Sequence, residues 1–230
     1  MMFDSSLILL LPAILLSFYA QHKVQSTFRK FAQIGSAKGL TGREVAERLL
    51  AAQGIRDVDV VAFPGQLSDH YDPRNKTVAL SEVVYNETSL SALSVAAHEV
   101  GHAIQHNEGY APLSFRTGLF PVANIGSKLA MPLLIIGIIM STQVFGIWML
   151  YAGIALFSFA TLFQVATLPV EFNASSRALA LLEEQRFLDE REIIPARKVL
   201  NAAALTYVAA ALASLIQLLR FVLIAAGRRD

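Results

Sequence analysis

Cysteine is absent from the 230 residues of this sequence, and charged residues are few. Without cysteine no disulfide framework can form, and any bound metal must use histidine, aspartate or glutamate as ligands. Lysine, arginine, aspartate and glutamate make up 16% of the chain, whereas an ordinary soluble domain has about 25%. With 54% hydrophobic residues and a mean hydropathy of +0.49, the chain is too apolar for an ordinary soluble domain.

Strong charge of either sign is also missing, since the formal net charge is only +1. This balance gives no reason to expect nucleic acid as a partner. The sequence has no internal repeat and no low-complexity tract. Histidine is scarce, so every possible imidazole ligand can be named: His22, His70, His98, His102 and His106.

The first long apolar run is LILLLPAILLSFYA, residues 7–20. A signal peptide should begin with positive charge, but the preceding MMFDSS contains Asp4 and no lysine or arginine. Positive charges follow the run instead, beginning with Lys23 and Arg29. The positive-inside rule then predicts an uncleaved transmembrane helix over residues 5–20, with the N-terminus outside. The run is short for a span, so a cleaved signal peptide stays an alternative.

The second half of the chain predicts three more spans. Residues 129–168 contain no charged side chain and are about twice as long as one helix that crosses a core of roughly 30 Å. The polar Ser141-Thr142-Gln143 therefore predicts a hairpin of two helices. The expected order is a transmembrane helix over 5–20, a cytoplasmic catalytic region over 21–118, a transmembrane hairpin over 119–168, a cytoplasmic segment over 169–201 and a transmembrane helix over 202–226.

Residues 98–102 are HEVGH, an HExxH sequence within a predicted helix over residues 89–107. Apolar residues recur there at helical spacing, whereas His98 and His102 share the polar face, where both could bind one zinc ion. Glu99 would take a proton from a water that the zinc activates. The alternative is a chance match on a solvated helix whose histidines only form hydrogen bonds.

A catalytic zinc site needs a third protein ligand and an open position for water. His106 is too far, because eight helical residues place it about 12 Å along the axis from His98. His70 would have to reach the ion from a loop and remains an alternative. Glu171, in LPVEFNASSRA just beyond the third span, is the better candidate. It could instead be a charged residue that only marks the end of that span.

A short helix and two strands are predicted ahead of the HExxH segment. Thr41 and Glu44 form a capping-box pattern that begins a helix ending before Gly54. VDVVAF, residues 58–63, and TVALS, residues 77–81, predict strands. In many metallopeptidases a strand edge near the metal pairs with the extended substrate. Residues 77–81 are therefore either such an edge or a plain structural strand.

HEVGH, the apolar hairpin and VEFNASSRAL together resemble the membrane neutral zinc metallopeptidases, the YugP-like family, as does DHYDPRNKTVALSEVVY ahead of the HExxH helix. The resemblance covers nearly the whole chain. More distantly, the chain is similar to the heat-shock membrane proteases and the CAAX prenyl proteases. The resemblance implies His98, His102 and Glu171 as zinc ligands and Glu99 as the catalytic base. Ser175 and Asn173 stand where those families carry an aspartate.

The sequence thus predicts a mainly α integral membrane protein with about four transmembrane helices and a gluzincin-like HExxH domain with a small β-sheet. We expect a zinc metalloendopeptidase of the cell membrane, with its active site facing the cytoplasm, that acts on membrane or membrane-associated proteins. His70, Tyr71 and Arg177 are candidates for a second oxyanion donor. The alternatives are a non-proteolytic membrane scaffold or assembly factor with a structural zinc, and a soluble secreted protease. No particular oligomeric state is predicted.

Overall fold

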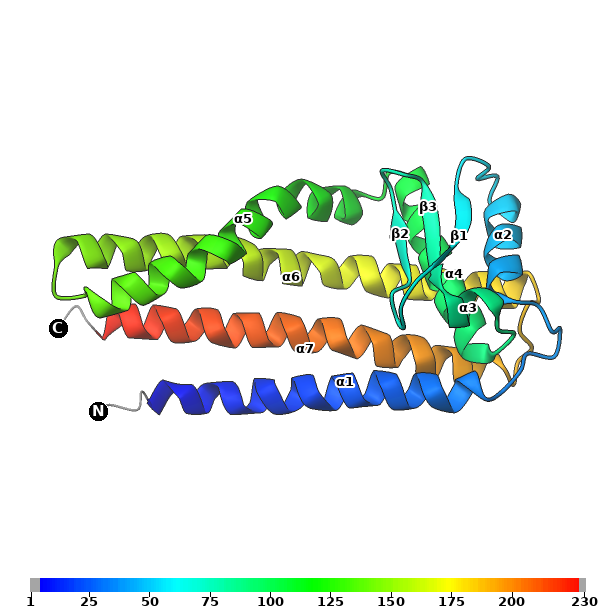
Figure 1. Cartoon of the computed structure of the whole chain (residues 1–230), viewed down its shortest axis with the longest axis horizontal. Coiled ribbons are helices and arrows are strands. Elements are labelled where there is room, and N and C mark those ends of the chain that lie inside the picture. Colours follow the sequence, from blue (N-terminus) through cyan, green and yellow to red (C-terminus); the bar gives the residue numbers. More distant parts are fainter. Residues whose placement is uncertain (1–4, 228–230) are drawn as a thin grey trace. The chain divides into compact units, whose positions relative to one another are not determined.

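The computed structural model describes residues 5–227, and Figure 1 shows its helices and strands. The chain forms two compact units. The first unit comprises residues 1–19, 114–168 and 206–230, and the second comprises residues 20–113 and 169–205. The elements are a 3-10 helix, η1 (Ser5–Leu10), the helices α1 (Leu11–Ala32), α2 (Gly42–Ala52), α3 (Glu82–Asn86), α4 (Leu90–Asn107), α5 (Ala111–Ile139), α6 (Val144–Glu184) and α7 (Ile193–Ala226), and the strands β1 (Asp59–Phe63), β2 (His70–Asp72) and β3 (Thr77–Ser81). The helices α1, α5, α6 and α7 each contribute residues to both units.

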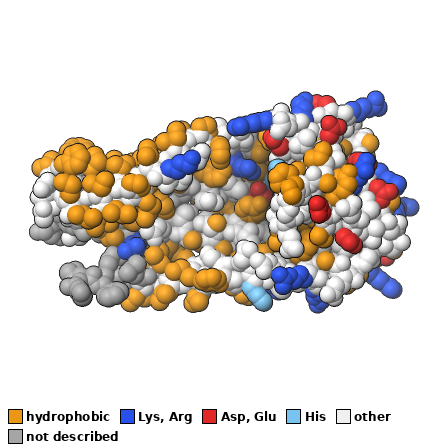
Figure 2. Space-filling model, viewed as in Figure 1, with side chains coloured by type: hydrophobic (Ala, Val, Ile, Leu, Met, Phe, Trp, Pro, Cys, Tyr) orange, Lys and Arg blue, Asp and Glu red, His pale blue; other side chains and the backbone are white. Residues whose placement is uncertain are grey.

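The first unit is built from apolar helices with a small core. Leu134 of α5, Leu150 of α6 and Phe221 of α7 are buried together in it. Glycine allows close packing, since a Cβ on Gly126 would lie 2.8 Å from the carbonyl oxygen of Leu156. The surface of this unit is largely hydrophobic, as Figure 2 shows. An apolar surface over apolar helices is what a lipid environment requires.

Three helices among residues 5–227 are long and apolar enough to cross a membrane: α5, α6 and α7. The predicted hairpin at Ser141–Gln143 is confirmed, because α5 ends at Ile139 and α6 begins at Val144. The expected count of four spans is wrong. The helix α1 is not among the three, because its apolar residues end at Ala20 and polar residues from Gln21 onward fill the rest of the helix.

The second unit packs the short helices and a three-stranded sheet around α4. The capping box that begins α2 is confirmed: the Thr41 hydroxyl accepts from the Glu44 amide, and the Glu44 carboxylate accepts from the Thr41 amide. Leu49 of α2, Leu80 of β3 and Leu93 of α4 are fully buried in one core. The sheet therefore lies against helices on its inner side.

The sheet contains one strand more than the sequence predicted. Its order is β1-β3-β2, with β1 parallel and β2 antiparallel to β3. The strand β1 pairs with all of residues 77–81, and β2 pairs with residues 77–79, so β3 is the central strand of the sheet. The short β2 is one of the two edge strands, and it contains His70 and Tyr71.

The helix α4 is predicted correctly, with Ser89 as its N-cap, and it is buried on nearly all sides. Most of its polar face is buried, since Ser91, Ser94 and Gln105 are buried and the His102 side chain is only 12% exposed. Gly101 allows α6 to approach closely: a Cβ there would lie 2.7 Å from the carbonyl oxygen of Ala174. This contact brings the histidine face of α4 against residues 169–184 of α6.

Replacing Gly101 with alanine tests this contact. We expect Gly101→Ala to destabilise the purified protein by about 1–3 kcal/mol, because backbone atoms of α6 must move to admit the methyl group. The measurement is the midpoint of thermal unfolding. The control is Gly118→Ala on α5, where no atom lies within 4 Å of the added Cβ. That change should stabilise the helix slightly. Equal effects of the two substitutions would contradict the close packing.

Candidate metal centre

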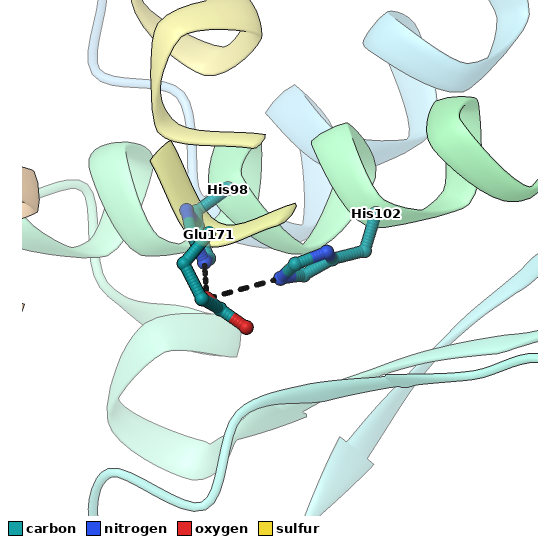
Figure 3. Close-up of side chains that lie close together, drawn as sticks. All are labelled: His98, His102 and Glu171. Carbon is teal, nitrogen blue, oxygen red and sulfur yellow. Dashed lines mark hydrogen bonds and ion pairs between the residues drawn. The ribbon is translucent and has the colours of Figure 1, made fainter. Parts of the chain in front are cut away.

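Three potential metal ligands meet between α4 and α6 within the second unit. Nε2 of His98 lies 3.2 Å from Oε2 of Glu171, and Nε2 of His102 lies 3.5 Å from the same oxygen (Figure 3). One donor atom from each residue lies within 4.8 Å of the other two. His98 is 9% exposed and Glu171 is 4% exposed. Residues separated by about seventy positions in the chain thus form one compact, sheltered cluster.

The chemistry of these three side chains fits zinc. Two imidazole nitrogens and one glutamate oxygen are a recurrent donor set of catalytic zinc sites, in which a fourth position is open to water. The rings of His98 and His102 are nearly perpendicular, with centroids 4.8 Å apart. Each ring therefore directs one nitrogen toward Glu171 without stacking on the other ring.

The second nitrogen of each histidine has a partner of its own. The Ser175 hydroxyl lies 3.1 Å from Nδ1 of His98, and Oε1 of Gln105 lies 3.0 Å from Nδ1 of His102. An oxygen that accepts from Nδ1–H fixes the tautomer in which Nε2 carries the lone pair. Both rings are thereby prepared to bind a cation through Nε2.

The amide of Gln105 is held in one orientation by α6. Its Nε2 donates to the Val170 carbonyl oxygen at 2.8 Å and to Oδ1 of Asn173 at 2.9 Å, which leaves Oε1 for His102. Asn173 Oδ1 also accepts from Nε of Arg177 at 2.8 Å. The Arg177 guanidinium forms an ion pair with Glu108 at 2.7 Å. This chain of contacts runs from the surface to the His102 ring.

Glu99 lies between the two histidines in the sequence and is buried beside them, with 7% of its surface exposed. Burial raises the pKa of its carboxyl above the ordinary value; His98 and His102 oppose this shift, whereas Glu171 and Asp69 add to it. A carboxylate with a raised pKa is a better proton acceptor near neutral pH. The position therefore suits a general base.

The other predicted site residues lie outside the three-ligand cluster. Nδ1 of the exposed His70 donates to the Ser68 carbonyl oxygen at 2.8 Å. The Tyr71 hydroxyl is hydrogen-bonded to Nδ1 of His106 at 2.8 Å. Arg177 contacts Glu108 and Asn173 as described. His70 is thus not in the group of side chains that could hold a metal among the described residues.

Sequence reasoning missed three residues around the cluster. Gln105 lies three residues after His102 on the same helix, and this spacing is the signal that could have identified it. Ser175, four residues after Glu171, shares the Glu171 face of α6, but a hydroxyl there did not indicate a histidine partner. Asp69 gave no local signal; its carboxylate accepts from the Ser81 backbone amide at 2.7 Å and from the Ser81 hydroxyl.

Comparison with known proteins points to a family of zinc metallopeptidases. The family described as "Putative neutral zinc metallopeptidase" matches residues 6–226. The chain is 50% identical to "Putative membrane protease YugP" of Bacillus subtilis (strain 168) over 224 residues. The aligned region covers 96% of this chain and 97% of that protein. No solved structure matches the chain.

Removing one ligand at a time tests the cluster. We expect His98→Ala and Glu171→Ala to lose bound zinc, measured as metal content per purified chain, because two remaining ligands hold the ion poorly. The matched controls are His70→Ala and His106→Ala, which should keep the wild-type zinc content. Stoichiometric zinc in both Glu171→Ala and His98→Ala would rule out this ligand set. Loss of zinc in His70→Ala alone would instead identify His70 as a zinc ligand.

Proposed function

The chain belongs to the neutral zinc metallopeptidase family, and we propose that it is a membrane-embedded zinc metalloendopeptidase. The resemblance stated from HEVGH and VEFNASSRAL is confirmed at the level of the family. One observation supports the catalytic role above all others. Nitrogens of His98 and His102 converge on the carboxylate of Glu171 beside a second, buried carboxylate, that of Glu99.

His98, His102 and Glu171 would hold the zinc ion through two nitrogens and one oxygen. When bound, zinc supplies a Lewis acid that lowers the pKa of a water ligand to about 7 and polarises a carbonyl oxygen. Ser175 and Gln105 keep the two imidazole rings in the tautomer that this binding needs.

Glu99 is the general base in this proposal. Its carboxylate takes a proton from the attacking water and then passes it to the nitrogen of the departing peptide. Burial supports both steps, since it raises the pKa of the carboxyl and strengthens its interaction with nearby positive charge. A site that only fixed the fold through a structural zinc would need no such carboxylate.

Arg177 fits a positioning role better than that of an oxyanion donor. Its guanidinium is bound to Glu108 and Asn173, and Asn173 in turn contacts the Gln105 amide that orients His102. We therefore propose that Arg177 acts on the centre through Gln105. His70 and Tyr71, both on the edge strand β2, remain the candidates for stabilising the oxyanion.

The substrates that we propose are membrane proteins or membrane-associated peptides. Glu171 belongs to α6, one of the three helices apolar enough to span a bilayer, and it follows the charge-free run that ends at Leu168 by three residues. A metal ligand at this position places the reaction near the bilayer surface. The relative from Bacillus subtilis is itself named as a membrane protease.

We further propose that the metal centre faces the cytoplasm. If α5, α6 and α7 each cross the bilayer, residues before α5 share one side with the connection between α6 and α7. That connection and the helix ends beside it contain Arg186, Arg191 and Lys198, whereas the loop from Ser141 to Gln143 contains no positive charge. The positive-inside rule then assigns the side that contains the α6–α7 connection and the metal centre to the cytoplasm. This assignment does not use residues 5–20.

The substitution Glu99→Gln tests the mechanism. It keeps the shape of the side chain but removes the proton acceptor, so cleavage of a casein-like substrate should fall by about 10²–10⁴-fold, or about 3–5.5 kcal/mol of barrier. Zinc content and thermal stability should stay near the wild-type values. The control is Glu47→Gln, which removes a partly exposed carboxylate on α2 and should leave activity unchanged.

Two results would overturn the proposal in different ways. Wild-type activity in Glu99→Gln would exclude Glu99 as the base. If the wild-type protein binds zinc but cleaves nothing, with or without a chelator, the alternative of a scaffold or assembly factor with a structural zinc takes its place.

Single cysteines test the orientation, because the chain has none of its own. We expect Asn75→Cys, in the turn before β3, to resist a membrane-impermeant thiol reagent in intact cells and to react after lysis. Thr142→Cys in the α5–α6 hairpin is the matched control and should react in intact cells. Both positions are exposed, so burial does not decide the result. The reverse pattern of labelling would place the metal centre outside the cell.

A further inference from the structure

A basic groove lies between α1 and α7 in the second unit, and no residue of the metal centre lines it. Its volume is about 430 Å³. It is lined by Lys23, Thr27, Lys30 and Phe31 of α1 and by Lys198, Asn201, Ala202 and Leu205 of α7. Three lysines thus surround a single concavity that no carboxylate lines.

Helical spacing explains why these side chains face one another. On α1, Lys23, Thr27 and Lys30 are four and three residues apart, so they occupy one face of the helix. On α7, Lys198, Asn201, Ala202 and Leu205 follow the same spacing. The groove is therefore formed by two regular helix faces, and its shape does not depend on a loop.

The lysines of the groove differ from three basic residues of this unit that pair with carboxylates. Arg43 pairs with Glu47, Lys76 with Asp57, and Arg177 with Glu108. Within residues 5–227, by contrast, Lys23, Lys30 and Lys198 form no ion pair with a carboxylate. All three are exposed, and Lys30 lies over the ring of Phe31 at 5.6 Å. Three positive charges therefore line this groove without a carboxylate partner among the described residues.

The groove lies where apolar and charged segments of the chain meet. On α1, Lys23 follows the end of the apolar run at Ala20 by three residues. On α7, Ala202 and Leu205 open the apolar stretch that extends to Ala226, in a helix long and apolar enough to span a bilayer. The α7 lining thus changes from basic to apolar toward this stretch, and on α1 the basic residue Lys23 is the lining residue nearest the apolar run. A groove at such a junction lies at the level of lipid headgroups when α7 spans the membrane.

We propose that this groove binds a phosphate-bearing anion, and specifically the headgroup of an anionic phospholipid. The three ammonium groups attract the phosphate, and the Thr27 hydroxyl and the Asn201 amide can donate hydrogen bonds to its oxygens. The side chain of Leu205, on the side of the groove where the apolar stretch of α7 begins, suits the glycerol and first methylene groups. Basic pockets between membrane helices on the cytoplasmic side are typical binding places of such headgroups. This inference rests on the proposed membrane placement of α7, but not on the peptidase mechanism.

A soluble phosphate could use the same charges, so the experiment compares both sources. Purified full-length protein in detergent is titrated with phosphatidylglycerol, with phosphatidylcholine of the same acyl chains, and with inorganic phosphate. Native mass spectrometry counts the lipid that is retained on the protein. We expect phosphatidylglycerol to bind more tightly than phosphatidylcholine, and inorganic phosphate at millimolar concentration to leave the bound lipid in place.

Substitutions that remove the lysine charges test whether the lipid binds in this groove. Each lysine near a membrane surface contributes about fivefold to the affinity for anionic lipid, so the triple substitution of Lys23, Lys30 and Lys198 to glutamine should weaken phosphatidylglycerol binding about hundredfold. The triple substitution to arginine keeps the charge and should keep the binding. The matched control is Lys38→Gln, an exposed lysine of the same unit outside the groove. If the triple glutamine variant does not fold, a fivefold loss in Lys198→Gln alone is the deciding result.

Three results would overturn the proposal. The first is equal retention of phosphatidylglycerol by the wild-type protein and the glutamine variants. The second is equal binding of phosphatidylcholine and phosphatidylglycerol by the wild-type protein. The third is displacement of the lipid by inorganic phosphate, which would make the groove a site for a soluble anion. Failure of Glu99→Gln to lose peptidase activity would leave this lipid test unaffected.

Discussion

The backbone contact between Gly101 and Ala174 determines whether the metal centre can form. The two histidines and Glu171 come from distant parts of the chain, and their side chains are short compared with the usual distance between packed helices. A residue without a side chain at Gly101 lets α4 and α6 approach until the carbonyl group of Ala174 would collide with any Cβ. Gly101, inside HEVGH, therefore allows Glu171 of α6 to reach the histidines of α4.

Around this contact the protein orients the two histidines with neutral groups. Oε1 of Gln105 accepts from Nδ1 of His102, and the Ser175 hydroxyl is hydrogen-bonded to Nδ1 of His98. The Gln105 amide is itself fixed by the Val170 carbonyl and by Asn173. Both partners lie within 3.1 Å of their histidine nitrogens, so the rings are oriented without an additional negative charge.

Local patterns predicted the parts of the structure that depend on local interactions. The HExxH helix, the capping box at Thr41 and the hairpin after Ile139 all follow from spacing or from short motifs. The position of Glu171 beside the histidines is a tertiary contact, and its choice as a ligand candidate came from its place after the third span and from the family resemblance. The strand β2 was missed because three residues carry too little pattern, and its pairing with β3 is a tertiary contact. The helix α6 continues through Pro169 to Glu184, so residues 169–184, expected as part of a separate cytoplasmic segment, extend the helix of the third predicted span. The acceptors Gln105 and Ser175 became recognisable only once α4 and α6 were placed together.

The neutral acceptors also affect the charge balance of the centre. A divalent cation held by two neutral imidazoles and one carboxylate keeps one positive charge in excess, and neither Ser175 nor Gln105 cancels it. In a buried site that excess must be met by a nearby anion, and Glu99 is the carboxylate placed to meet it. Base and metal would then stabilise each other in the resting protein. If Glu99 takes its proton from a water at the centre, the hydroxide left behind would carry the negative charge in its place, so the centre would keep its charge balance while the proton moves.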